Sequence, residues 1–198
     1  MLFSKQKVAG LIKYYGLSDW WLASFIDQER KLIIRTYQPL GSDSNSLTKG
    51  EYLGTAPPPL SFLSNLASLF KKPETYQIAK RLLDKAEEYV SETKRAVDIH
   101  FHYQNKLQIY YRNRETEPDA LEKAITACEQ QISLSEKAAR VMKEEGLPMH
   151  MGFQQLAIIR EKQKDYEAVI RISERALKEG WIGDCERRIE KAKKKLGI

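Results

Sequence analysis

The sequence predicts an all-α protein built from antiparallel helix pairs, and three observations support this prediction. Apolar residues recur every three or four positions from Leu60 to the C-terminus, which is the spacing of one helix face. Proline and glycine stand where these segments are expected to start and stop. No stretch has the alternation of apolar and polar residues that is typical of a strand.

The chain divides into residues 1–56 and residues 57–198. The first part predicts a short amphipathic helix over 1–17 that ends near Gly16, followed by a helical element that carries Trp20 and Trp21 and continues or restarts up to Pro39. We expect one tryptophan to face the core and the other to lie near the surface. So many large apolar side chains need cover, so this segment is expected to cap the first helix pair downstream. Residues 41–54 are rich in Ser, Gly and Asn and predict a loop.

The second part begins after Pro57, Pro58 and Pro59, which favour an extended entry. Helices are predicted over 60–71, 73–93, 97–114, 118–145, 149–162, 166–179 and 184–196, the last being a polar, lysine-rich cap. The prolines also interrupt the uncharged stretch 52–70, so a membrane span is not predicted.

Two of the pairs share an internal spacing. The first helix of the first pair has large, large, small and large residues at Leu63, Leu66, Ala67 and Phe70, and its second helix follows with Tyr76, Ala79, Leu83 and Ala86. The last pair repeats this pattern with Phe153, Leu156 and Ala157, then Asp165 and Tyr166 at the turn and Ala176 near the end.

These residues resemble the tetratricopeptide repeat (TPR) family, over residues 60–180 at most. The chain departs from the family pattern where Ala67 and Ala157 replace glycine, and where Val169 and Ser173 replace a small and a large residue. The middle pair fits the repeat pattern only if residues are inserted around 112–117. Its candidate positions are Tyr103, Leu107 and Tyr110 on the first helix and Leu121, Ala124, Ile125 and Cys128 on the second. An irregular helical bundle is the alternative.

The resemblance implies a TPR-like right-handed α-α superhelix whose first helices line a concave groove that binds a peptide or helix. The family's register assigns this groove to Ser64, Ser68, Lys71, Phe101, Gln104, Gln108, Tyr111, Arg112, Met151, Gln154, Ile158 and Glu161. The lysine and asparagine set with which some family members clamp a C-terminal carboxylate is absent from these positions.

No sequence motif indicates catalysis, a cofactor or a metal. His100 and His102 are two residues apart and should point to different sides of a helix, and His150 stands alone between Met149 and Met151. No phosphate loop, nucleophile elbow or HExxH motif occurs. We therefore expect a protein without enzymatic activity.

The expected function is that of an adaptor whose groove binds another protein or a second copy of the chain. Nucleic-acid binding is the alternative, because the net charge is +6 and the C-terminus carries Arg187, Arg188, Lys191, Lys193, Lys194 and Lys195, interrupted by Glu186 and Glu190. The two cysteines fall within helical patterns, and no signal peptide is predicted, which favours the cytoplasm.

Overall fold

The computed structural model describes residues 8–38, 44–143 and 146–198, and the described residues are helical apart from turns and connections. The N-terminal part contains α1 (Gly10–Tyr14), α2 (Ser18–Ser24), α3 (Asp27–Thr36) and the 3-10 helix η1 (Ser44–Leu47). The second part contains α4 (Pro59–Ala67), the 3-10 helix η2 (Pro73–Thr75), α5 (Tyr76–Glu87), α6 (Ala96–Arg112), α7 (Ala120–Ser133), α8 (Ser135–Met142), α9 (Met151–Lys162), α10 (Tyr166–Lys178) and α11 (Cys185–Leu196). An isolated bridge between Met149 and Ile182 is the one β-type pairing among these residues. The all-α prediction is confirmed.

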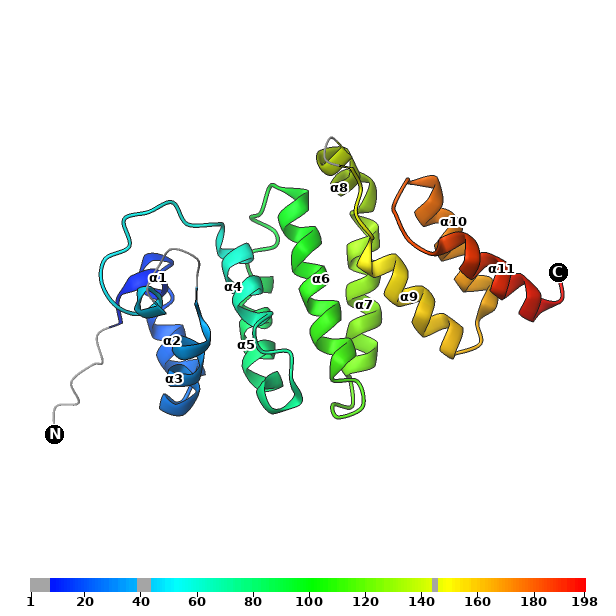
Figure 1. Ribbon diagram of the computed structural model, residues 1–198. Coiled ribbons are helices and arrows are strands. Elements are labelled where there is room, and N and C mark those ends of the chain that lie inside the picture. Colours follow the sequence, from blue (N-terminus) through cyan, green and yellow to red (C-terminus); the bar gives the residue numbers. More distant parts are fainter. Residues whose placement is uncertain (1–7, 39–43, 144–145) are drawn as a thin grey trace.

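The helices follow one another from α1 at one end of an elongated molecule to α11 at the other (Figure 1). Helix α4 packs on α5 and α6, α6 on α7, α7 on α9, α9 on α10, and α10 on α11. Because successive long helices are antiparallel, α4, α6 and α9 run in the same direction. We call these three the first helices, since each opens a pair.

The N-terminal segment packs on the first pair. The Tyr15 ring stacks on Phe62 of α4 with 4.7 Å between centroids. Arg81 of α5 forms an ion pair with Glu29 of α3, and its guanidinium carbon lies 4.8 Å from the centroid of the Phe25 ring.

The two adjacent tryptophans differ in environment, which confirms that prediction. Trp21 is 1% exposed and belongs to the core, whereas Trp20 is half-buried. The ring of Trp21 lies 5.2 Å from that of Phe25. One side of α2 is therefore anchored in the core.

Two hydrophobic clusters succeed each other along the molecule. The first joins the N-terminal segment to α4 and α5 and reaches Ile109, Tyr110 and Ala124. The second is centred on Leu107, Cys128, Phe153, Leu156, Ala176 and Trp181. Helices α6 and α7 contribute to both clusters and join them. The apolar residues predicted to define the first pair are all buried.

The predicted helix over 118–145 is wrong as a single element, because the chain breaks at Leu134 into α7 and α8. The hydroxyls of Ser133 and Ser135 donate to the carbonyls of Gln130 and Ile132, and Arg175 of α10 also donates to the Ile132 carbonyl. Serine side chains that bond nearby carbonyls compete with regular helix geometry. A residue distant in sequence therefore helps to end α7.

The predicted core position of Leu121 is also wrong. Leu121 is 37% exposed, whereas Ala120, Ala124, Ala127 and Cys128 are fully buried. Small residues at this spacing let α7 approach α6 closely. The buried face of the second helix is thus displaced by one residue from the prediction at its start.

Three further helices are shorter than predicted. Helix α4 ends at Ala67, where Leu69 and Phe70 donate to carbonyls three residues earlier, and α5 ends at Glu87 in the same way through Tyr89 and Val90. The helix predicted over 1–17 is regular only over Gly10–Tyr14, and residues 1–7 lie outside the described part. The predicted loop overlaps η1, while Pro39 and residues 41–43 lie outside the described part.

Within the described residues, no helix combines the length and apolar character that a bilayer crossing requires.

Candidate functional site

The side chains that the groove prediction names lie on the first helices α4, α6 and α9 or, for Ser68 and Lys71, directly after α4. Half-buried members of this set can meet a partner without unfolding of the chain. Eleven of the twelve predicted groove residues are half-buried or exposed, namely Ser68, Lys71, Phe101, Gln104, Gln108, Tyr111, Arg112, Met151, Gln154, Ile158 and Glu161. We call these residues the first-helix face.

Ser64 is the exception, and its predicted place in the groove is wrong. It is 1% exposed and accepts a hydrogen bond of 3.1 Å from the Asn105 amide of α6. Helices α4 and α6 pack directly against each other, so a serine at this point is covered by the neighbouring first helix. Ser64 therefore joins two helices and cannot meet a partner directly.

Contacts between side chains link the first helices along the face. The ammonium group of Lys71, four residues beyond the end of α4, donates to the Gln108 amide oxygen of α6 at 2.6 Å. The Lys162 ammonium group at the end of α9 donates to the Tyr111 hydroxyl of α6 at 3.2 Å. Of the predicted residues, Lys71 and Gln108 thus contact each other across 37 positions of sequence, and Tyr111 contacts Lys162, which was not predicted.

The face continues onto α11, where Glu161 of α9 binds two cations. Its carboxylate lies 3.4 Å from Arg188 and 2.5 Å from Lys191, and the four polar groups around it line a cleft of about 240 Å³. Arg188 also pairs with Asp184 at 2.9 Å. This end of the face is neutralised by internal ion pairs.

The two ends of the face differ in chemistry. Phe101, near the start of α6, is 41% exposed, and Met151 opens α9. Arg112 and Gln154 make no side-chain hydrogen bond or ion pair with any described residue. Along α6 the face therefore runs from the apolar Phe101 through the amides of Gln104 and Gln108 to the cation Arg112.

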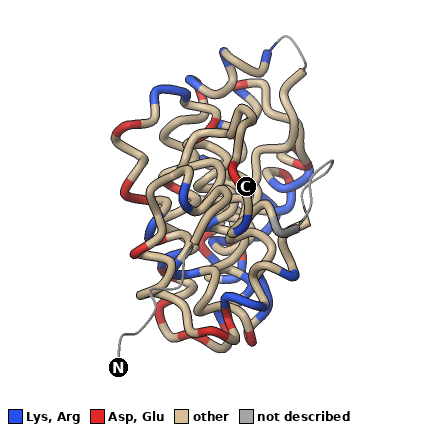
Figure 2. The backbone as a smooth tube through the Cα atoms, turned by 90° about the vertical axis from the view of Figure 1, so that its left-hand side faces the viewer, with Lys and Arg blue, Asp and Glu red and all other residues tan. Residues whose placement is uncertain are grey.

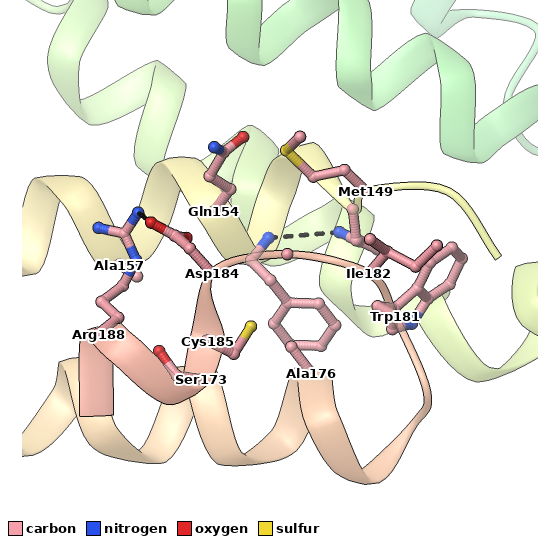
Figure 3. Close-up of a pocket in the computed structure, with 13 residues that line it drawn as sticks. Met149, Gln154, Ala157, Ser173, Ala176, Trp181, Ile182, Asp184, Cys185 and Arg188 are labelled. Atoms are coloured by element: carbon pink, nitrogen blue, oxygen red, sulfur yellow. Dashed lines mark hydrogen bonds and ion pairs between the residues drawn. The ribbon is translucent and has the colours of Figure 1, made fainter. Parts of the chain in front are cut away.

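A small pocket lies between α9, α10 and the turn that precedes α11 (Figure 3). Trp181 and Ile182 lie at one end of it, and Asp184, Cys185 and Arg188 lie at the other. The volume open to a water-sized group is about 10 Å³, and the buried Ser173 hydroxyl has no hydrogen-bond partner among the described residues. Such a volume fits about one water molecule and no organic ligand.

A buried polar cluster beside this pocket was missed by the sequence reasoning. The rings of His100 on α6 and His150 before α9 have centroids 4.8 Å apart, and Trp181 stacks on His100 at 5.8 Å. The Gln131 amide of α7 donates to His100 Nε2 at 3.0 Å, and the Phe153 backbone N–H donates to His150 Nδ1 at 3.3 Å. We call these five residues the histidine junction. Trp181, predicted to pack on the last pair, thereby also reaches the middle pair.

Burial decides the charge state of the histidine junction. Burial lowers the pKa of His100 to about 4, and burial together with the neighbouring His100 lowers the pKa of His150 to about 3. Both rings are therefore neutral near pH 7. Three polar atoms of the junction have no hydrogen-bond partner among the described residues, namely His100 Nδ1, His150 Nε2 and Gln131 Oε1.

His102 points away from His100, as predicted. Its Nε2 lies 2.9 Å from the Glu87 carboxylate of α5, which Lys106 also binds at 2.6 Å. Burial alone would raise the pKa of Glu87, but hydrogen bonds from His102 and Lys106 lower it to about 2. In the described part of the chain, no three His, Cys, Asp or Glu side chains are arranged to hold a metal ion.

The basic residues of α11 are partly neutralised. Arg187 and Arg188 pair with Asp184, and Lys191 pairs with Glu161, while Lys193, Lys194 and Lys195 have no ion pair among the described residues. Viewed from the side of α1, lysine and arginine positions are mixed with acidic positions (Figure 2).

Comparisons with protein-family models, curated proteins and solved structures found no match to this chain.

Proposed function

We propose that this chain is a non-enzymatic, cytoplasmic adaptor whose first-helix face binds a peptide segment or a helix of another protein, or of a second copy of the chain. In this proposal residues 57–198 form a TPR-like right-handed superhelix, and residues 1–56 cap it.

The observation that carries the proposal is that side chains of the first-helix face from different helices contact one another or neighbouring first helices. Lys71, which follows α4, contacts Gln108 of α6, and Lys162 at the end of α9 contacts Tyr111 of the same α6. Side-chain amides on such a surface can donate to and accept from the backbone of an extended peptide. Phe101 and Ile158 add apolar area at which a partner's side chain can be anchored.

The state of the cysteines agrees with a reducing compartment. Cys128 is buried in α7, Cys185 is the first residue of α11, and neither forms a disulfide. Burial raises the pKa of the Cys128 thiol to about 12, which keeps it protonated and unreactive.

Site-specific photocrosslinking tests the proposal. We expect a benzophenone side chain at Gln108 or Ile158 to crosslink a partner in cell lysate, and the same group at the exposed Arg171 or Glu122 of α10 and α7 to give no such product. Analytical ultracentrifugation of the purified protein distinguishes self-association from a foreign partner.

The identified partner then allows a direct test of the face. Replacement of Gln104, Gln108, Gln154 and Ile158 should weaken binding by about tenfold or more, since central interface contacts often exceed 1 kcal/mol. Unchanged binding in a correctly folded variant would exclude the first-helix face as the site.

A further inference from the structure

Three cations at or just beyond the C-terminal ends of the first helices form no ion pair with a described acidic residue. They are Lys71 after α4, Arg112 at the end of α6 and Lys162 at the end of α9, and we call them the cation cluster. Two other lysines, Lys106 of α6 and Lys191 of α11, do form ion pairs, with Glu87 and Glu161 respectively.

Neutral groups hold two members of the cluster. The Lys71 ammonium group is held by the Gln108 amide oxygen, and that of Lys162 by the Tyr111 hydroxyl. Lys162 Nζ lies 5.8 Å from the centroid of the Tyr111 ring, and the Arg114 guanidinium carbon lies 4.1 Å from the same centroid. A fourth cation therefore borders the cluster, and its own partner, Glu115, is an exposed residue at 3.1 Å.

Helix dipoles explain only part of this arrangement. Arg112 and Lys162 lie in the last turns of their helices, where a positive charge is favourable. Lys71 lies four residues beyond the end of α4 and is half-buried. Burial lowers the pKa of Lys71, and the charge of Arg112 lowers it further. The charged form of Lys71 is therefore destabilised until an anion approaches.

We propose that the cation cluster binds the carboxylate side chains of an acidic segment in a protein partner. The inference rests on the proposed function and adds the chemical class of the ligand. An incoming carboxylate would add an opposite charge beside Lys71 and Arg112, so its attraction would offset the repulsion between these two cations and it would accept new hydrogen bonds.

The distribution of chemistry along α6 also orients the bound segment. Phe101 and Arg112 are separated by about 16 Å along this helix, at 1.5 Å per residue. An extended peptide spans that distance with about five residues. We therefore expect an apolar residue about five positions from the acidic residues of an extended ligand, with the apolar residue near Phe101 and the acids at the cation cluster.

A peptide fits this surface better than a nucleic acid. Single-stranded nucleic acids bind to open aromatic faces with a row of cations along the backbone. Here the Tyr111 ring is contacted by Arg114 and Lys162, and the carboxylate of Glu161 lies beside the cluster on α9. The cations are confined to one end, and amides occupy the middle of the face.

Fluorescence anisotropy with designed probes tests the inference on the full chain. The first probe is a fluorescein-labelled peptide of about twelve residues with Leu and Phe near one end and glutamates about five positions away. The second has glutamine in place of every glutamate, and the third is labelled oligothymidylate. We expect the glutamate peptide to bind more tightly than the glutamine peptide, with an affinity that falls as salt is added.

Matched variants separate the cluster from net charge. The cluster variant carries Lys71→Gln, Arg112→Gln and Lys162→Gln, and the control variant carries Lys94→Gln, Lys137→Gln and Arg171→Gln at exposed positions away from the cluster. Both lose the same charge. We expect the cluster variant to lose about 20-fold or more in affinity for the glutamate peptide, and the control variant to lose about 3-fold or less.

Other outcomes overturn the inference in distinguishable ways. Equal losses in both variants would show a net-charge effect, and no binding of the glutamate peptide at all would reject the site. If the glutamine peptide binds equally well and Ile158→Asp abolishes its binding, the proposed function stands and the acidic ligand is wrong. Cluster-dependent binding of oligothymidylate alone would reject both.

Titration of Lys71 gives an independent readout. Bound glutamate peptide should raise the pKa of this ammonium group toward its ordinary value, because a nearby negative charge stabilises the protonated form. NMR of the lysine side-chain Cε–Hε signals follows this change. An unchanged Lys71 titration in the saturated complex would place the acids elsewhere.

Discussion

Gly152, in the first turn of α9, shows how a single residue sets the approach of two helices. A Cβ atom at this position would lie 2.8 Å from the Gln131 side-chain oxygen and 3.1 Å from the Cys128 carbonyl oxygen of α7. Both distances are shorter than ordinary contact. The absence of a side chain therefore allows α9 to cross α7 closely and to bring His150 to the histidine junction.

The substitution Gly152→Ala should consequently destabilise the protein. The methyl group forces Gln131 or the α7 backbone to move, and we expect the free energy of unfolding to fall by about 1–2 kcal/mol, despite the better helix propensity of alanine. Urea denaturation measures this change. Gly183→Ala is the control, because its Cβ would meet only Cys185 Sγ, at 3.6 Å, and it should change stability by less than about 0.5 kcal/mol. An equal loss of stability in the two variants would show that the contact between α7 and α9 at Gly152 is not tight.

At the scale of elements, the histidine junction ties α6 and α7 to α9 and to the turn after α10. His100, Gln131, His150 and Trp181 each come from a different segment and are buried. Arg175 of α10 faces the same region, with its guanidinium carbon 5.7 Å from the Phe153 ring centroid, and the Glu179 carboxylate accepts from Trp181 Nε1 at 3.1 Å. The junction depends on both histidines remaining neutral, so acid should weaken it.

We expect stability to fall as the pH decreases from about 6.5. The unfolded histidines bind protons below pH 6.5, whereas folded His100 and His150 bind them only near their pKa values of about 4 and 3. The unfolded state therefore binds more protons in this window, which costs about 2 kcal/mol per histidine at pH 5. Glu87, with a pKa lowered to about 2, loses its stabilising effect only at more acidic pH.

Urea denaturation between pH 7.5 and pH 5 tests this expectation, with pH values chosen around the ordinary pKa of histidine. His100→Phe keeps an aromatic ring against Trp181 and removes one titrating group. Its absolute stability also reflects the lost hydrogen bond from Gln131, so the slope with pH is the relevant quantity. That slope should be clearly smaller than in the original chain, and an identical slope would exclude His100 as a source of the acid sensitivity.

At the scale of the whole molecule, the two hydrophobic clusters make the chain a nearly linear assembly. Leu63 belongs only to the first cluster, Leu156 only to the second, and α6 and α7 connect them. In assemblies in which each unit contacts mainly its neighbours, local damage stays partly local.

Hydrogen exchange should reveal this division. Leu156→Ala should cost about 2–5 kcal/mol and lower the protection of amides in α9, α10 and α11 more than in α2 and α3, and Leu63→Ala should do the reverse. Both leucines are at most 5% exposed, which makes the pair comparable. A uniform loss of protection throughout the chain in both variants would show a single cooperative unit instead.

Local patterns in the sequence were sufficient for much of this structure. The period of apolar residues and the positions of proline and glycine located most of the helices, since these signals act within a few residues of each other. The register of the resembled repeat family named twelve groove candidates, and eleven of them are half-buried or exposed. The sequence also predicted that His100 and His102 point to different sides, because helix geometry alone decides it.

Tertiary structure decided what depends on packing between distant segments. Ser64 is buried because α6 covers it, α7 ends at Leu134 partly because Arg175 binds the Ile132 carbonyl, and His150 meets His100 across fifty positions of sequence (150 − 100). The contacts of Lys71 with Gln108 and of Lys162 with Tyr111 likewise form only after the helices have docked. The sequence by itself determined most of the helices and which residues are apolar, whereas the packing of the helices determined the chemistry of the surface, because side chains far apart in the chain interact only after the helices have docked.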